Sequence, residues 1–238
     1  MEHPLTVLYH VTITLTYAAS LLYNILYVNE EGGNTLTYRG YGGKFKFLTF
    51  WNFCLQTFYF GLCVVNDLTG TNPGPGPAQR KKSSLKAFID KFLASIGFPM
   101  GVFVVTTFWA IFYVDRELVF PRKLDGIIPP WLNHIMHTVP LPFLLLDKYM
   151  VYHEYPPRGK AMLTTIVFAS VYQAWILWIA YYTNFWVYPV LEVLNNAQRC
   201  VFFLTLWAFL ISIYLLGEGL SGFWWRYEKA KAVTSKKR

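Results

Sequence analysis

The amino-acid sequence predicts an all-α membrane protein, a polytopic bundle of about six transmembrane helices with both termini in the cytoplasm. Of its 238 residues, 55% are hydrophobic and 14% are charged, and the mean hydropathy is +0.32. A soluble domain would carry about a quarter charged residues. Six apolar runs, each of roughly the 20 residues that a helix needs to cross a bilayer, alternate with short charged segments. The runs lack the alternating pattern of barrel strands, so helices are the spanning elements.

Each apolar run is expected to form one transmembrane helix within a single domain, residues 1–238. The first run is not read as a signal peptide, because no basic residues precede it and it is too long. Pro140 and Pro142 are expected to kink or loosen the fourth helix. In chain order, the spans are predicted near residues 6–28, 46–68, 92–114, 128–147, 161–182 and 200–222.

Two polar segments are expected to lie outside the membrane. Residues 69–90 contain GTNPGPGP, in which glycine and proline prevent regular structure, and then the basic stretch QRKKSSLK. They are predicted to form a flexible basic cytoplasmic loop, and residues 223–238 a basic cytoplasmic tail. The three cysteines fall within predicted spans and are interpreted as packing residues rather than as a disulfide framework.

Lysine and arginine set the orientation, because positive residues are enriched on the cytoplasmic side. Six spans place both termini on one side with the loops around 69–91 and 148–160. That side carries fourteen Lys and Arg residues and the other side seven. The net charge of +8 therefore reflects topology and proximity to anionic membrane lipids, and it gives no reason to expect nucleic acid as a partner.

His134 and His137 lie three residues apart in WLNHIMHTVPLP, inside the fourth apolar run. Ionisable residues in a span usually face the bundle interior or a wet cavity and are functional candidates, although a structural interhelical hydrogen bond would also explain them. An H-x-x-H pair suggests a metal ion, but zinc or iron needs three or four ligands. The other histidines, His3, His10 and His153, are placed toward the cytoplasmic side. We therefore expect no metal and no cofactor.

A histidine that binds no metal can serve as a general base, which requires a nearby nucleophile. The sequence has no G-x-S-x-G motif, which excludes an ordinary α/β-hydrolase. The second span begins with a polar stripe of Thr49, Asn52 and Gln56 at helical spacing. A lone threonine in a span usually bonds only the carbonyl four residues back, but the stripe favours a role for Thr49. Helical rise puts Thr49 about 5 Å and His137 about 12 Å below the outer end of their spans, so both belong to one leaflet.

Several motifs give the chain a family resemblance. They run in order from about residue 41 to 218: YGGKFKFLTF, FPMGVFVV, DRELVFP, IIPPWLNHIMHT, WVYP and YLLGE. The sequence resembles the family of androgen-induced and androgen-dependent TFPI-regulating proteins. The resemblance implies a multi-pass, atypical threonine hydrolase that cleaves fatty acid esters of hydroxy fatty acids. It implies Thr49, in KFLTF, as the nucleophile and His137, the second histidine of NHIMHT, as the catalytic histidine.

This hypothesis describes a dyad that forms an acyl-threonine intermediate, which water from the outer surface hydrolyses. Helical phase places Asn52 and Asn133 where they could orient His137 or donate to an oxyanion. His134 and Gln56 are candidates for supporting the site. The substrate is expected to be a branched lipid ester with a carboxylate at the membrane interface. The candidate carboxylate-binding residues are Arg39, Lys44, Lys46 and Arg122.

Two other classes of protein stay open at this point. One is a non-enzymatic lipid-binding regulator, which the composition permits. The other is a channel or transporter, although no inverted repeat is evident and the cytoplasmic halves of the spans hold few polar residues. The sequence fits either the plasma membrane or the endoplasmic reticulum, and it does not determine chain-length preference or oligomeric state.

Overall fold

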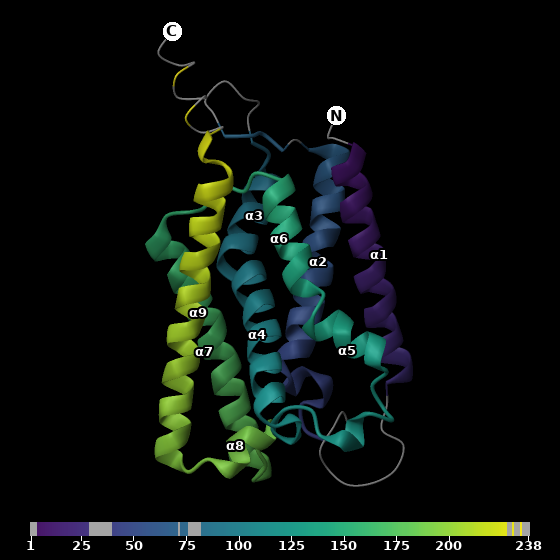
Figure 1. Ribbon diagram of the computed structural model, residues 1–238, viewed down its shortest axis with the longest axis vertical. Coiled ribbons are helices and arrows are strands. Elements are labelled where there is room, and N and C mark those ends of the chain that lie inside the picture. Colours follow the sequence, from purple (N-terminus) through teal and green to yellow (C-terminus); the bar gives the residue numbers. More distant parts are fainter. Residues whose placement is uncertain are drawn as a thin grey trace.

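The computed structural model describes residues 4–28, 40–70, 72–75, 82–227, 230 and 234, and all regular structure in these ranges is helical. Most of the long helices run along one axis (Figure 1). The prediction of an all-α polytopic membrane bundle is confirmed. Among the described residues, five helices are long and apolar enough to cross a membrane: α1 (Pro4–Tyr27), α2 (Leu48–Thr69), the continuous segment Ser84–Val114, α7 (Arg158–Thr183) and α9 (Asn196–Trp224).

The third spanning segment begins earlier than its hydropathy suggests. It consists of α3 (Ser84–Phe92), a π-helical turn η2 (Leu93–Gly97) and α4 (Phe98–Val114). The side chain of Ser83 accepts a hydrogen bond from the Lys86 N–H and so caps the helix. The prediction of a flexible loop is therefore wrong for residues 84–90. The loop residues 71 and 76–81 lie outside the described part of the chain.

The fourth predicted span is two helices rather than one. α5 (Pro130–His137) is inclined to α6 (Pro140–Met150), as Figure 1 shows. Proline has no N–H, so Pro140 cannot continue the hydrogen-bond ladder of α5. The N–H groups of Thr138 and Val139 both donate to the His134 carbonyl instead, at 2.8 and 3.0 Å. The prolines were expected to kink or loosen one helix, and in the structure the helix ends completely, directly after His137.

The bundle packs around α4, which contacts α2, α6 and α9. α1 packs along α2, where Tyr17 stacks on Phe60 with ring centroids 5.9 Å apart. α4 and α6 approach each other closely at Gly101: a Cβ there would lie 2.3 Å from Cδ1 of Leu144. A second apolar cluster joins α7 to the start of α2.

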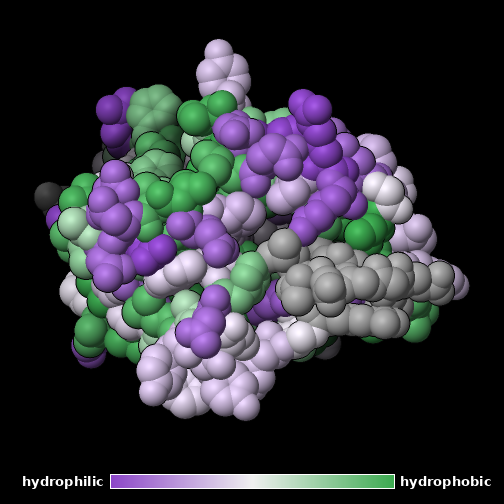
Figure 2. Space-filling view, turned by 90° about the horizontal axis from the view of Figure 1, so that it is seen from below, coloured by the Kyte–Doolittle hydropathy of each residue, from purple (hydrophilic) through white to green (hydrophobic). Residues whose placement is uncertain are grey.

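Short elements gather at the lower end of the bundle in Figure 1. They are η1 (Gly43–Lys46), η3 (Arg116–Leu118), η4 (Arg122–Leu124) and α8 (Pro189–Val193). The surface of this end mixes polar and apolar side chains (Figure 2). α1 begins and α9 ends at the opposite end, and the side of the membrane that each end faces stays a prediction. Of the predicted basic tail beyond Tyr227, only residues 230 and 234 are described.

The upper end in Figure 1 holds a buried charge cluster that the sequence analysis did not foresee. His10 on α1 bonds Asp67 on α2 at 2.6 Å and Asp147 on α6 at 2.9 Å. His153 lies 3.2 Å from the same Asp147 and 3.0 Å from Asp90 on α3. Hydrocarbon would not solvate these charges, so each is satisfied by a neighbour across the bundle. The cluster ties four helices together at one end.

Candidate functional site

Thr49 and His137 lie in direct contact. The Thr49 hydroxyl is 3.0 Å from Nε2 of His137. Thr49 is the second residue of α2 and His137 is the last residue of α5. The sequence analysis placed the two residues in one leaflet from helical rise alone, and the structure brings their side chains together.

The hydroxyl of Thr49 differs in its bonding from other helical threonines of the chain. Most of the others donate to the carbonyl four residues back, as do Thr16, Thr57, Thr106, Thr164 and Thr205. For Thr49 that carbonyl belongs to Phe45, which already accepts from the indole N–H groups of Trp51 and Trp175. The threonine hydroxyl therefore bonds His137 instead of a backbone carbonyl.

The imidazole of His137 is fixed in one orientation. Its Nδ1 lies 2.8 Å from Oδ1 of Asn133 and 3.1 Å from the Asn133 backbone oxygen. A backbone carbonyl can only accept, so Nδ1 carries the proton and Nε2 is left as the acceptor for Thr49. The ring also stacks on Phe108, with centroids 3.6 Å apart. This is the tautomer and position that a general base for Thr49 requires.

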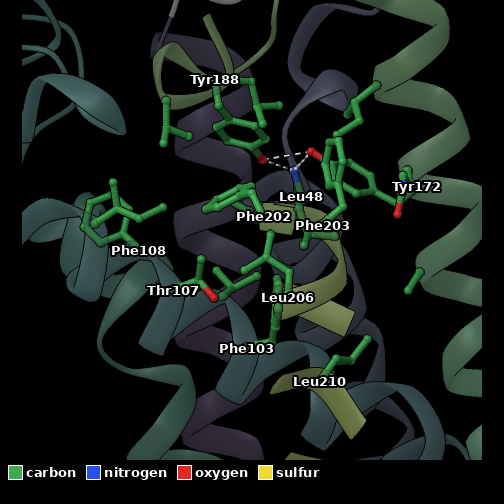
Figure 3. A pocket seen from close by; sticks show the side chains of 18 of the residues that line it. Leu48, Phe103, Thr107, Phe108, Tyr172, Tyr188, Phe202, Phe203, Leu206 and Leu210 are labelled. Carbon is green, nitrogen blue, oxygen red and sulfur yellow. Dashed lines mark hydrogen bonds between the residues drawn. The ribbon is translucent and has the colours of Figure 1, made fainter. Parts of the chain in front are cut away.

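Two tyrosines hold the start of α2. The backbone N–H of Leu48 donates to the hydroxyls of Tyr172 and Tyr188, at 2.9 and 3.0 Å (Figure 3). Among the described residues, the next N–H, that of Thr49, has no hydrogen-bond partner, as is usual in the first turn of a helix. Such N–H groups favour negative charge. An oxyanion formed beside the threonine would meet this donor.

Two cavities meet at Thr49. The larger, of about 130 Å³, is lined almost entirely by apolar side chains of α4, α7 and α9, including Phe103, Phe203 and Leu206 (Figure 3). The smaller, of about 60 Å³, borders both Thr49 and His137. The Thr49 side chain therefore borders an almost wholly apolar cavity on one side and a cavity shared with His137 on the other.

The other polar candidates divide between the site and its surroundings. Asn133 contacts His137, as helical phase suggested. Asn52 instead accepts a hydrogen bond from the side chain of Gln56 at 2.9 Å. The same Gln56 amide donates to the Gly97 carbonyl at 2.9 Å, so this pair of side chains links α2 to η2. His134 is exposed and bonds the Thr138 hydroxyl at 3.0 Å. Among the described residues, none of these last three side chains forms a hydrogen bond with Thr49 or His137.

The predicted carboxylate-binding residues do not converge on the cavities. Arg39 lies outside the described residues. Burial lowers the pKa of Lys44, whose ammonium donates to the Asn24 carbonyl. The Lys46 ammonium lies 5.6 Å from the ring centroid of Phe47, and the exposed Arg122 pairs with Glu117 at 3.6 Å. None of the three described residues lines either cavity, and their predicted role stays untested.

Within the described residues, no group of three or more His, Cys, Asp or Glu side chains is arranged to hold a metal ion. Phe108, Tyr172 and Tyr188 also shape the site, and they are not among the residues predicted from the sequence. Aromatic residues in apolar runs look like ordinary core residues, and only the WVYP motif around Tyr188 singles one of them out. The role of the two tyrosines depends on tertiary contacts across more than 100 residues of chain, and that of Phe108 on its stacking against His137.

The fold and the site define a class of protein, a polytopic helical membrane protein with a threonine–histidine pair beside apolar cavities. The model of the FAR-17a/AIG1-like protein family matches residues 5–222, so the chain belongs to this family.

Similar proteins agree with this assignment over nearly the whole chain. The androgen-induced gene 1 protein of Homo sapiens is 37% identical over 219 residues, which cover 91% of this chain and 92% of that protein. The androgen-dependent TFPI-regulating protein of Homo sapiens is 34% identical over 223 residues, 92% of this chain and 93% of that protein. No solved structure matches the chain.

Proposed function

We propose that the protein is an intramembrane esterase that hydrolyses fatty acid esters of hydroxy fatty acids, with Thr49 as nucleophile and His137 as general base. The observation that carries the proposal is the 3.0 Å contact between the Thr49 hydroxyl and Nε2 of His137 beside an apolar cavity. Nucleophile and base within hydrogen-bond reach, with the base held by a third group, are the signature of covalent catalysis.

In the first half of the reaction, the Thr49 oxygen attacks the ester carbonyl carbon while its proton passes to Nε2 of His137. The Thr49 N–H, at the start of α2, is the donor nearest to the developing oxyanion. The carbon–oxygen bond to the alcohol then breaks, and His137 returns its proton to the departing alkoxide. The hydroxy fatty acid is released and the acyl group stays on Thr49.

In the second half, a water molecule attacks the acyl carbon and gives a proton to His137. The bond to Thr49 breaks, and the threonine oxygen takes this proton back from Nε2. The products are the free fatty acid and the regenerated dyad. Asn133 keeps the proton on Nδ1 throughout and stabilises the imidazolium that forms in each half, so it acts as a positioning residue.

The surroundings of the dyad support a lipid substrate. The larger cavity is lined by aliphatic and aromatic side chains, with few polar groups. A hydrocarbon chain that moves there from the bilayer stays in apolar surroundings, whereas water or ions would find few hydrogen-bond partners. An apolar lining of this kind favours an esterase over the channel or transporter alternative.

Substitutions at Thr49 test the proposal most directly. Thr49→Val keeps the β-branched shape but removes the oxygen, so hydrolysis of a branched ester by the purified protein should fall by at least about 1,000-fold. His137→Ala should fall comparably, and the double variant should be little worse because the pair acts as one unit. Thr49→Ser retains a hydroxyl and should keep partial activity.

A fluorophosphonate probe provides the second readout. It should label the wild-type protein on Thr49, label His137→Ala weakly and fail to label Thr49→Val. His134→Ala is the matched control, because this exposed histidine of the same helix bonds Thr138 and, among the described residues, not Thr49, and it should retain most of the labelling. Wild-type hydrolysis rates in Thr49→Val would show that the threonine is a packing residue, and the mechanism would be wrong.

A further inference from the structure

A second hollow lies between α7 and α9. It adjoins the larger of the two cavities at Thr49, which is called the catalytic cavity from here on. This α7–α9 groove, of about 740 Å³, is more open than the catalytic cavity, and most of its lining residues are partly exposed. α9 packs mainly on α4 and contacts α7 little, so the two helices stand apart here. In a bilayer, an opening between two spanning helices faces lipid. The groove is therefore accessible from within the membrane.

The groove and the catalytic cavity share a thin wall. Gln173, Phe203 and Trp207 line both of them. The wall is closed by one polar contact, in which the indole N–H of Trp207 donates to Oε1 of Gln173 across the two helices. Moving these side chains would join the groove to the cavity that reaches Thr49.

One cation, Arg199 near the start of α9, lines the groove. Its Nε donates to the Leu191 carbonyl at 2.8 Å and its Nη1 to Oδ1 of Asn196 at 2.7 Å, while the guanidinium lies 4.2 Å from the ring centroid of Trp186. Among the described residues, Nη2 has no hydrogen-bond partner. The guanidinium is thus held rigidly and keeps one donor group for an anion.

We propose that the α7–α9 groove is the lateral entrance for the substrate and that Arg199 binds the substrate's free carboxylate. This inference rests on the proposed function and adds a recognition site to it. The groove supplies apolar surface for the hydrocarbon chain, and Arg199 supplies the opposite charge for the carboxylate, which guanidinium binds with charge-assisted hydrogen bonds.

The spacing along α9 suits such a ligand. Arg199 and Trp207 are eight residues apart, about 12 Å at helical rise. A carboxylate at Arg199 would therefore place the chain about eight to ten carbons further in at the wall of the catalytic cavity.

The first test compares a branched ester that has a free carboxylate with its methyl ester. Wild-type protein should prefer the acid, through a lower KM. Arg199→Gln should raise KM for the acid by about tenfold, the loss of one charge-assisted contact, and so abolish the preference. Arg158→Gln is the matched control, since this exposed arginine pairs with Glu218 outside the groove, and it should keep the preference.

The second test does not depend on hydrolysis, because Cys200 lies exposed in the groove. In neutral detergent, a maleimide should label Cys200, as quantified by peptide mass. A non-hydrolysable ether analogue with a free carboxylate should slow this labelling, its methyl ester should do so much less, and Arg199→Gln should remove the difference.

The outcomes separate the two proposals. If wild-type protein shows no ester hydrolysis but the acid analogue protects Cys200, the carboxylate site stands and the proposed function fails. If hydrolysis is present but Arg199→Gln leaves both the acid preference and the protection unchanged, the entrance proposal is wrong. Equal protection by an anionic phospholipid would show that the groove holds membrane lipid, which would also overturn it.

Discussion

Asn133 decides which nitrogen of His137 faces Thr49. Its backbone and side-chain oxygens lie 3.1 and 2.8 Å from Nδ1, and both accept. Without these acceptors, the proton of the neutral imidazole could move to Nε2. A protonated Nε2 cannot take the proton of Thr49, so in the proposed mechanism the amide of Asn133 acts on the reaction through the histidine.

Asn133→Ala should lower kcat by about 10- to 100-fold without changing KM for the ester, because only part of the general-base contribution is lost while the backbone acceptor remains. Asn133→Asp restores an acceptor and should recover much of the rate. Steady-state kinetics of the two purified variants would measure this. An unchanged kcat in Asn133→Ala would mean that the backbone carbonyl and Phe108 suffice to orient the ring.

At the residue scale, the sequence permits prediction of the dyad but not of its surroundings. Thr49 and His137 stand out because they are polar in apolar runs and match the motifs of one family, and helical phase places Asn133 next to the histidine. Arg199 carries no such signal, because its position in a groove depends on how α7 and α9 separate. Lys44 and Lys46 are nearer in sequence to Thr49, yet they line neither cavity.

At the scale of elements, the start of α2 positions Thr49, the proposed nucleophile. The hydroxyls of Tyr172 and Tyr188 lie 2.8 Å apart, and both accept from the N–H of Leu48, one residue before Thr49. The two tyrosines come from α7 and from the residue before α8. The α2 N-terminus is therefore tied to elements more than 100 residues away in the chain.

Tyr172→Phe and Tyr188→Phe should each lower kcat modestly, since one hydroxyl can still accept from Leu48. The double variant leaves this partly buried N–H without either hydroxyl, which costs up to about 3 kcal/mol, and it should lower kcat well beyond the product of the two single effects. Kinetics together with thermal unfolding in detergent would measure both quantities. Additive effects of the two substitutions on kcat would show that the two hydroxyls do not act together as acceptors for the Leu48 N–H.

Helix positions follow from hydropathy, whereas the helix breaks and extensions do not. The long runs of apolar residues predict α1, α2, α7 and α9 to within a few residues. The start of α3 at Ser84 was missed because its first turns are polar, and their burial depends on partners such as Asp90. The break after His137 was only partly foreseen, as a kink, because two prolines can bend a helix or end it depending on what packs around them.

At the scale of the whole molecule, the dyad lies toward one end of the bundle and the charge cluster lies at the other. Asp147 is fully buried and accepts from Tyr59 and from His10, with His153 at 3.2 Å. Removing one charge from a buried ionic network leaves its partners uncompensated. We expect the cluster to hold the bundle together rather than to take part in ester cleavage.

Asp147→Asn should therefore destabilise the protein by about 3–5 kcal/mol, visible as a lower thermal unfolding temperature in detergent and as reduced abundance in membranes. Asp125→Asn is the matched control. Asp125 pairs with Arg116 at an exposed site, and its loss should cost no more than about 1 kcal/mol. Equal unfolding temperatures for Asp147→Asn and the wild type would exclude a structural role for the cluster.

The order in which the charge cluster is synthesised has a consequence for biogenesis. His10 emerges from the ribosome first, then Asp67, and Asp147 only on α6, after α3, α4 and α5. The first two helices can satisfy each other through the 2.6 Å pair between His10 and Asp67, so they are suited to leave the translocon as a hairpin. The charge cluster is complete only when α6 has been synthesised and Asp147 packs against His10 of α1. A nascent chain that ends before α6 would hold α1 and α2 in the membrane without the carboxylate that joins them to the rest of the bundle.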